Sequence, residues 1–233
     1  MSRVVFLLAL GACTGSRTEA APAAHTAPSI DLAPVTAEAL CVTKGELTSA
    51  GAVAVPTMRG FARGAGGDAA QLSFTYRGES QDSRALASGD VRRQLGLKLR
   101  AQNSCNVVYV MWRLDPRPKI DVSVKVNPRQ STHEECGAEG YTKVRSRAKH
   151  YVPAYEYGSS HTLRAEILGD EIYVWADGRI VFQGRLPAGA RSLAGSAGVR
   201  SDNVAFDLVE LAAPPPAAGA DAPPACKRDG ASD

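Results

Sequence analysis

Residues 161–186 read HTLRAEILGDEIYVWADGRIVFQGRL, and this stretch decides the fold of the chain. In its first part, apolar residues alternate with polar ones at Leu163, Ala165 and Ile167. A period of two is typical of a strand with one buried face. Further on, two apolar runs flank Asp177-Gly178, a pair that accepts the positive φ angles of a tight turn. The stretch therefore predicts a strand followed by an antiparallel hairpin over residues 172–182.

The same alternation occurs in earlier parts of the chain. Its apolar positions are Leu72, Phe74 and Tyr76; Leu95, Leu97 and Leu99; and Ile120, Val122, Val124 and Val126. Residues 106–113 are more uniformly apolar, which favours a central strand, and residues 204–211 predict a last strand. The body shows no convincing helical periodicity. Many short strands joined by turns predict an all-β fold, with two antiparallel sheets packed as a sandwich or jelly roll.

Residues 195–211, GSAGVRSDNVAFDLVEL, continue the pattern beyond the hairpin. Together with residues 161–186 they resemble the C-terminal half of concanavalin A-like lectin/glucanase jelly rolls, a pattern shared with laminin-G-like domains. The common order is strand, "GD" turn, strand, "DG" turn, strand, a G-x-x-G-x-R-S-D-N segment and a closing strand. The resemblance implies a jelly roll of the concanavalin A-like type. It leaves the function open, because that fold hosts lectins, hydrolases and adhesion modules.

The N-terminus has the layout of a secretory signal. A positive Met-Ser-Arg start precedes the apolar residues 4–10, and Gly11-Ala12-Cys13 follows. The apolar run is shorter than the roughly 20 residues that span a bilayer. This ending resembles the lipobox of bacterial lipoproteins, which implies acylation of Cys13, palmitate included, and a membrane anchor. Thr14 after the cysteine favours the outer membrane, and an ordinary cleaved signal with a chance cysteine is the alternative.

Composition divides the chain into four parts. They are a signal peptide (1–12), a lipidated flexible linker (13–38), a β-sandwich domain (39–211) and a Pro/Ala-rich tail (212–233). The domain is long enough to bury a core of its own.

Four cysteines remain besides Cys13, and an even number in an exported chain predicts disulfides. Three pairings are possible. We favour Cys105–Cys136, which closes a local loop, and Cys41–Cys226, which joins the ends of the domain. By loop entropy such a bridge stabilises the fold by roughly 3–4 kcal/mol. Zinc is the rival interpretation, although the spacings contain no C-x-x-C.

Strand parity selects the candidate ligand-binding residues. Positions that alternate with the apolar ones face outward, and a concave sheet face with aromatic, cationic and acidic side chains is suited to bind sugars. The candidates are Lys98, Arg100, Tyr109, Arg113, Asp121, Lys125, Arg164, Glu166, Tyr173 and Trp175. Of the two tryptophans, Trp112 has buried parity and Trp175 is the better candidate for exposure. A solvated convex face with mixed charges is the alternative.

The positive charge is concentrated in the middle of the chain. The net charge is +3, but residues 91–200 hold 18 lysines and arginines against 10 acidic residues. Residues 141–157, YTKVRSRAKHYVPAYEY, interleave basic residues with tyrosines. This pattern is compatible with binding of a polyanion such as an acidic polysaccharide, lipopolysaccharide or extracellular DNA, without specific nucleic-acid recognition, although such a run is more often solvated. A solvated loop or edge strand is the alternative.

No catalytic residue is assigned. Hydrolases of this fold commonly carry E-x-D-x-E on one strand, and the motif is absent. Asp121 and Glu166 have the right parity to be the carboxylate pair of a glycosidase. His133-Glu134-Glu135 lies beside Cys136 and indicates a surface turn pinned by a disulfide rather than a metal site, so neither a metal nor a cofactor is expected.

These observations predict an exported, membrane-anchored lipoprotein that binds a glycan or another envelope polymer without catalysis. A structural or protein-interaction module of the cell envelope is the alternative, and a glycoside hydrolase ranks behind both.

Overall fold

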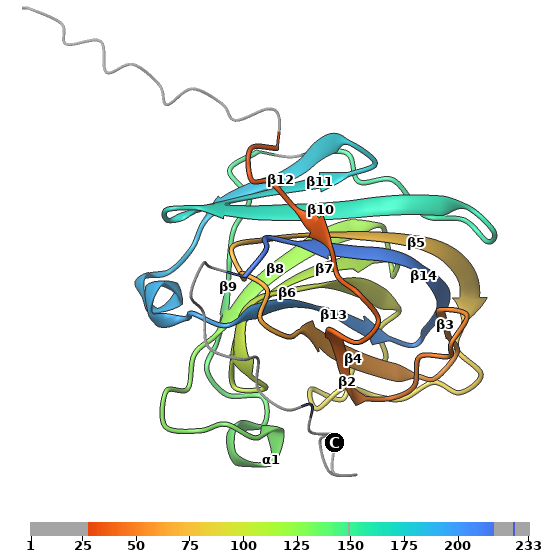
Figure 1. The fold of residues 1–233 in the computed structure, drawn as a ribbon, viewed down its shortest axis with the longest axis horizontal. Helices are drawn as coiled ribbons and strands as arrows, with labels where there is room; N and C mark the ends of the chain where they lie inside the picture. Colours follow the sequence, from red (N-terminus) through yellow and green to blue (C-terminus); the bar gives the residue numbers. More distant parts are fainter. Residues whose placement is uncertain (1–27, 149, 217–225, 227–233) are drawn as a thin grey trace, which may run out of the picture.

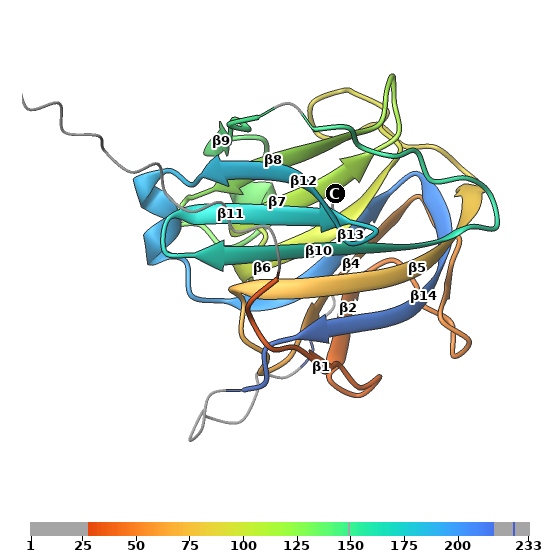
Figure 2. The same ribbon diagram turned by 90° about the horizontal axis from the view of Figure 1, so that it is seen from above.

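Two seven-stranded antiparallel sheets account for nearly all the secondary structure in this computed structural model, which describes residues 28–148, 150–216 and 226 (Figure 1). Sheet A has the strand order β1-β14-β5-β10-β11-β12, and β3 also pairs with β14. Its strands are β1 (Ala33–Pro34), β3 (Ala52–Val53), β5 (Ala69–Glu79), β10 (Ser160–Leu168), β11 (Glu171–Ala176), β12 (Arg179–Arg185) and β14 (Val204–Ala213). Figure 2 looks onto this sheet, with β12, β11, β10, β5 and β14 side by side.

Sheet B lies behind sheet A in that view and has the strand order β2-β4-β13-β6-β7-β8-β9. Its strands are β2 (Leu40–Lys44), β4 (Thr57–Ala62), β6 (Gln94–Asn103), β7 (Asn106–Arg113), β8 (Lys119–Lys125), β9 (Tyr141–Lys143) and β13 (Ser196–Asp202). A one-turn helix α1 (His133–Cys136) and a 3-10 turn η1 (Ala188–Ser192) complete the described elements. The predicted all-β, two-sheet antiparallel architecture is confirmed.

The core lies between the sheets and takes the apolar side chains at alternate positions of both. Trp112 on β7 is fully buried, as its parity predicts, and its indole Nε1 donates to the carbonyl of Pro153 over 3.0 Å. Phe74 and Tyr155 meet it edge to face at ring-centroid distances of 6.1 and 5.1 Å. This geometry contributes about 0.5–1.5 kcal/mol per pair beyond the burial of area.

The predicted hairpin is present as β11 and β12. Asp177 and Gly178 have φ angles of 49° and 75°, which is the backbone conformation that their residue types permit. The central strand predicted over residues 106–113 is β7, which pairs with β6 on one side and β8 on the other.

Both predicted disulfides are present. Cys41–Cys226 joins β2 to the C-terminal part of the chain across 185 residues, and Cys105–Cys136 closes a local loop across 31 residues. Such bridges are typical of proteins that fold in an oxidising compartment. Among the described residues, no helix is long and apolar enough to cross a bilayer. The predicted signal peptide and Cys13 lie outside the described residues.

Three strands of sheet B were not predicted from the sequence. Residues 196–202 form the interior strand β13 rather than a segment before the last strand, and β2 and β4 continue the sheet beyond it. The glycine-rich stretch 60–67 begins inside β4. A side chain at Gly60 would approach the carbonyl oxygen of Cys41 at 3.1 Å, because β2 packs closely there.

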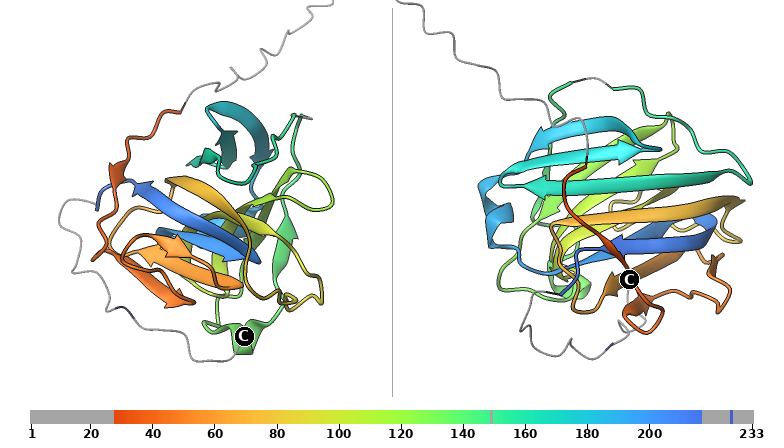
Figure 3. Two further views of the ribbon diagram at one scale, coloured as in Figure 1. Left: turned by 90° about the vertical axis from the view of Figure 1, so that its right-hand side faces the viewer. Right: turned by 45° about the horizontal axis from the view of Figure 1, so that its top comes forward.

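The N-terminal strap, which we define as residues 28–34, crosses the outer face of sheet A. In the right-hand view of Figure 3 it runs from β10 past β5 to β14, where β1 pairs with the end of β14. The fixed point is Glu166 on β10, which is fully buried and accepts hydrogen bonds from the backbone amides of Ser29 and Ile30. Residues that composition assigns to the linker thus lie against the domain.

Candidate ligand-binding groove on sheet B

A groove of about 460 Å³ lies on the outer face of sheet B. Its floor comes from β4, β13, β6, β7 and β8, and its wall residues come from β9, from loop 84–92 and from the turn around α1. This volume falls within the range of pockets that hold small ligands, roughly 300–1,000 Å³.

Strand parity places several polar side chains side by side on the floor of the groove. On β13, Ala197, Val199 and Ser201 alternate with Gly198, Arg200 and Asp202. Val199 packs in the core, so Arg200 points to the outer face. The neighbouring strands add Arg59 from β4 and Gln94 from β6, in register with Arg200 and Asp202 respectively.

An ion pair buried under the groove fixes the central guanidinium. Arg200 Nε donates to Asp202 Oδ2 over 3.0 Å, and Gln94 Nε2 donates to the same oxygen over 2.7 Å. Arg59 lies 3.8 Å from Asp202 Oδ1. Burial by itself raises the pKa of Asp202, but the charges of Arg200 and Arg59 outweigh it and hold this pKa below its ordinary value. The carboxylate therefore stays ionised and keeps Arg200 in one position.

Two tyrosines give the floor an aromatic side. The rings of Tyr109 (β7) and Tyr141 (β9) are stacked at a centroid distance of 6.1 Å and an interplanar angle of 29°. Arg200 holds its guanidinium carbon 4.8 Å above the Tyr109 ring, a cation–π contact. Tyr109 is only 4% exposed whereas Tyr141 is 41% exposed, so Tyr141 offers the accessible ring.

Loop 84–92 forms the wall at the end of the groove where β6 begins. Asn203, with a positive φ of 55°, links the two ends of the loop. Its side-chain amide donates to the carbonyls of Arg84 and Arg92 over 2.8 and 3.0 Å, and its Oδ1 accepts from the Arg84 amide over 2.7 Å. Because both loop ends are held by one side chain, the loop stays beside Gln94 and Arg200.

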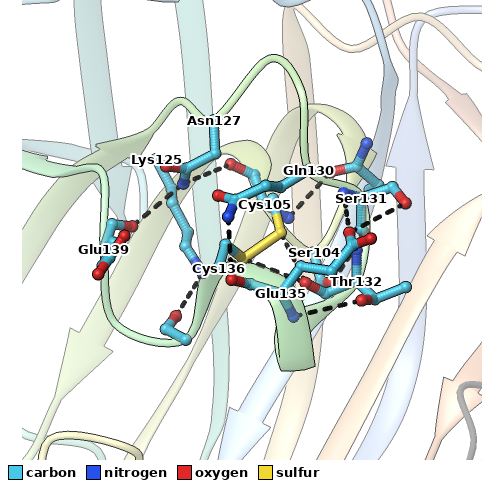
Figure 4. The surroundings of a disulfide bond; sticks show 12 residues. Ser104, Cys105, Lys125, Asn127, Gln130, Ser131, Thr132, Glu135, Cys136 and Glu139 are labelled. Carbon is cyan, nitrogen blue, oxygen red and sulfur yellow. Dashed lines mark hydrogen bonds between the residues drawn. A yellow bond between two sulfur atoms is a disulfide. The ribbon is translucent and has the colours of Figure 1, made fainter.

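The disulfide turn forms the wall at the other end of these strands (Figure 4). Cys105 precedes β7, and its bridge to Cys136 holds α1 against the sheet. A capping box between Thr132 and Glu135 closes the first turn of the helix. Lys125 is fully buried beneath the turn, where its Nζ donates to the carbonyl of Gly137 over 2.6 Å. The predicted surface turn pinned by a disulfide is confirmed.

Asp121 on β8 is the one carboxylate among the described residues that line the groove. Arg113 Nη1 donates to it over 2.9 Å, and Lys119 Nζ lies 3.2 Å from its other oxygen. Burial raises the pKa of Asp121, but these two cations outweigh that effect and lower it below its ordinary value. The groove thus holds one ionised acceptor.

The structure divides the ten predicted ligand-binding residues between two faces. Six lie on sheet B, and Arg100 is one of them. Of the other five, Tyr109 and Asp121 line the groove and Arg113 pairs with Asp121. Lys125 Nζ lies 5.1 Å from the centroid of the Tyr141 ring, and Lys98 points outward from β6. Arg100 departs from the predicted parity. Its positive φ of 46° marks an irregularity in β6, and its guanidinium pairs with Asp68 and the carbonyl of Ala190.

The other four lie on the opposite face of the sandwich, on the outer side of sheet A. Arg164 and Glu166 form an ion pair of 2.6 Å that holds the strap. Tyr173 and Trp175 are stacked at 6.2 Å and are 4% and 1% exposed, so the expectation that Trp175 is the exposed tryptophan is wrong. Asp121 and Glu166 likewise face away from one another, so they do not form the carboxylate pair of one cleft.

The basic segment over residues 141–157 is also divided. Tyr141 and Lys143 belong to β9 and line the groove, whereas Tyr155 is buried in the core, where its hydroxyl donates to the Trp112 carbonyl. Arg147 pairs with Glu171 at the edge of sheet A. Lys149 lies outside the described residues. Only the start of this segment therefore faces the same site as Tyr109.

Reasoning from the sequence missed Arg59, Arg200 and Asp202. The signal was present in the alternation of residues 196–202, but Gly195, Gly198 and the Asp202-Asn203 pair resemble turn residues. No group of three or more His, Cys, Asp or Glu side chains in the described part of the chain is placed to hold a metal ion.

The comparisons with known proteins bear on the fold. No family model and no curated protein matches the chain. Among solved structures, the carbohydrate binding module CBM66 from Bacillus subtilis superposes with a TM-score of 0.51 at 12% identity, over 74% of this chain and 93% of that one. A tetrameric galectin from the ball sponge Cinachyrella sp. superposes with a TM-score of 0.43 at 14% identity, over 68% of this chain and 99% of the galectin. The predicted concanavalin A-like jelly roll is confirmed.

Proposed function

We propose that the protein binds a glycan without catalysis, in the groove on the outer face of sheet B. The observation that carries this proposal is the accessible Tyr141 ring beside fixed polar groups on the groove floor, among them Arg200, Gln94 and Asp121. A sugar ring has apolar C–H faces that pack on an aromatic ring, and hydroxyls that bond to guanidinium, amide and carboxylate groups.

The fold supports this proposal. The module with which the chain shares its fold is described as carbohydrate binding, and sites on such sandwiches are added to a common frame. No second carboxylate among the described lining residues faces Asp121 across the groove, so binding is better supported than glycoside hydrolysis.

We further propose that the protein is exported and anchored to the outer membrane through a lipid on Cys13. The sequence supports this through its export signal and its Gly11-Ala12-Cys13 ending, and the two disulfides fit an oxidising compartment. Fourteen residues separate the anchor from residue 28, a reach of about 50 Å at most. The strap begins at Pro28 on the outer side of sheet A, and the groove lies on the opposite face of the sandwich.

A glycan array followed by titration of the best ligand tests the binding. Tyr141→Ala removes the accessible ring and is expected to weaken binding about tenfold. Tyr151→Ala is the matched control, because Tyr151 is 81% exposed and lies outside the groove. Binding that both variants retain equally, or no glycan bound at all, would contradict the proposal. A sugar-insensitive protein partner from the cell envelope would then favour an interaction module.

A further inference from the structure

The lining of the groove is strongly unbalanced in charge. Among the described lining residues, the cationic ones are Lys44, Arg59, Arg84, Arg92, Lys143 and Arg200, and the one acidic residue is Asp121. Two carboxylates next to the groove, Asp90 and Asp202, pair with Arg92 and Arg200. Among the described residues, cations of the lining still outnumber the carboxylates in and next to the groove by six to three when these two carboxylates are added. A concave surface of one sign concentrates ligands of the other.

Two of these cations have no carboxylate within 4 Å among the described residues. Arg84 and Lys143 are both exposed, and neither forms an ion pair there. Arg84 is positioned by its backbone, which Asn203 holds through two hydrogen bonds. Lys143 is positioned by β9, whose register with β8 places it opposite Ser123. They come from two different walls of the groove, with Tyr141 and Arg200 lining it as well.

The remaining polar groups distinguish a sugar acid from a bare phosphate chain. Asp121 is ionised and held in place, so it accepts hydrogen bonds from hydroxyl groups, which a sugar acid carries and a phosphate chain lacks. Ser123 and Gln94 add neutral hydrogen-bonding groups. Loop 84–92 and the disulfide turn close two sides of the groove, which suits a short stretch of a single polysaccharide chain better than a nucleic-acid duplex.

We propose that the ligand is an acidic polysaccharide whose carboxylate groups are bound by Arg84 and Lys143 while a sugar ring packs on Tyr141. This inference rests on the proposed function and names its substrate class. Carboxylate pairing with a guanidinium and an ammonium is charge-assisted, so the affinity of the groove depends on ionic strength.

The test is a titration with oligogalacturonate and with the same oligosaccharide after full methyl esterification. Both have the same sugar backbone, and the ester carries a neutral methyl ester in place of each carboxylate. The free acid is expected to bind at least tenfold more tightly, and its affinity is expected to fall several-fold as salt is raised from about 0.05 to about 0.5 M. Equal affinity for the two forms, with binding still dependent on Tyr141, would overturn the acidic ligand and leave glycan binding intact.

Lys143→Gln and Arg145→Gln form a matched pair for the same titration. Both residues are exposed cations two positions apart, and only Lys143 lines the groove. Lys143→Gln is expected to weaken binding of the free acid about fivefold, with no effect on the ester, and Arg145→Gln is expected to change neither. Equal losses in both variants would overturn the assignment to the groove. Polyphosphate bound as tightly as the free acid would show general polyanion binding and overturn the sugar-acid specificity.

Discussion

The two outer faces of this sandwich carry similar side chains, but one is covered by the strap and the other carries an open groove. Each carries a buried carboxylate paired with an arginine and a stacked aromatic pair: Arg200–Asp202 with Tyr109–Tyr141 on sheet B, and Arg164–Glu166 with Tyr173–Trp175 on sheet A. On sheet A, backbone amides of the strap donate hydrogen bonds to the Glu166 carboxylate. On sheet B, loop 84–92, β9 and the turn around α1 surround the Arg200–Asp202 pair and form a groove above it. Residue type and parity are thus similar on the face that carries the groove and on the face that holds the strap.

The largest effect is expected from Asp202→Ala. It leaves Arg200 buried without its carboxylate, which is expected to lower the free energy of unfolding by about 3–5 kcal/mol in urea titrations. Asp207→Ala is the control, because Asp207 is a third exposed and pairs with Arg77 at the surface, where a salt bridge contributes at most about 1 kcal/mol. Equal losses of unfolding free energy in the two variants would show that the Arg200–Asp202 pair contributes no more to stability than a surface ion pair, which would contradict this account.

A smaller effect is expected from Glu166→Ala. The variant loses charge-assisted hydrogen bonds to the strap, which are expected to contribute about 2–3 kcal/mol in total. Hydrogen exchange at the amides of Ser29 and Ile30 is expected to become much faster. Glycan affinity is expected to stay unchanged, because Glu166 faces away from the groove. A loss of affinity comparable to that of Tyr141→Ala would mean that sheet A takes part in binding.

The sequence predicts the elements whose signal is local. The alternation around Leu163, and the two apolar runs that flank the Asp177-Gly178 turn, can be recognised without knowledge of the rest of the fold, and β10, β11 and β12 form as predicted. The interior strand β13 was missed because Gly198, which allows close approach to β4, and Gly195 just before the strand are also typical turn residues. Which neighbours β13 acquires depends on sheet order, and no local pattern encodes it.

Only part of the candidate site could be predicted, because the arrangement of the strands is not encoded in local sequence patterns. Parity places Tyr109 and Asp121 on an outer face, but it does not say which outer face is covered. That choice depends on long-range contacts: the strap on Glu166, 136 residues away along the chain from Ile30, and Asn203 holding loop 84–92 beside the groove. Arg100 shows a further limit, since one positive φ angle in β6 turns its side chain away from the predicted direction.

The most direct test of the difference between the two faces is a map of backbone amide chemical shifts during titration with oligogalacturonate, or with the best ligand from the array. We expect the shifts to concentrate at Gln94, Tyr109, Tyr141 and Arg200, with none at Glu166 or Trp175. Shifts that cluster on β10 and β11 while the groove residues stay unchanged would contradict the assignment of the binding face to sheet B.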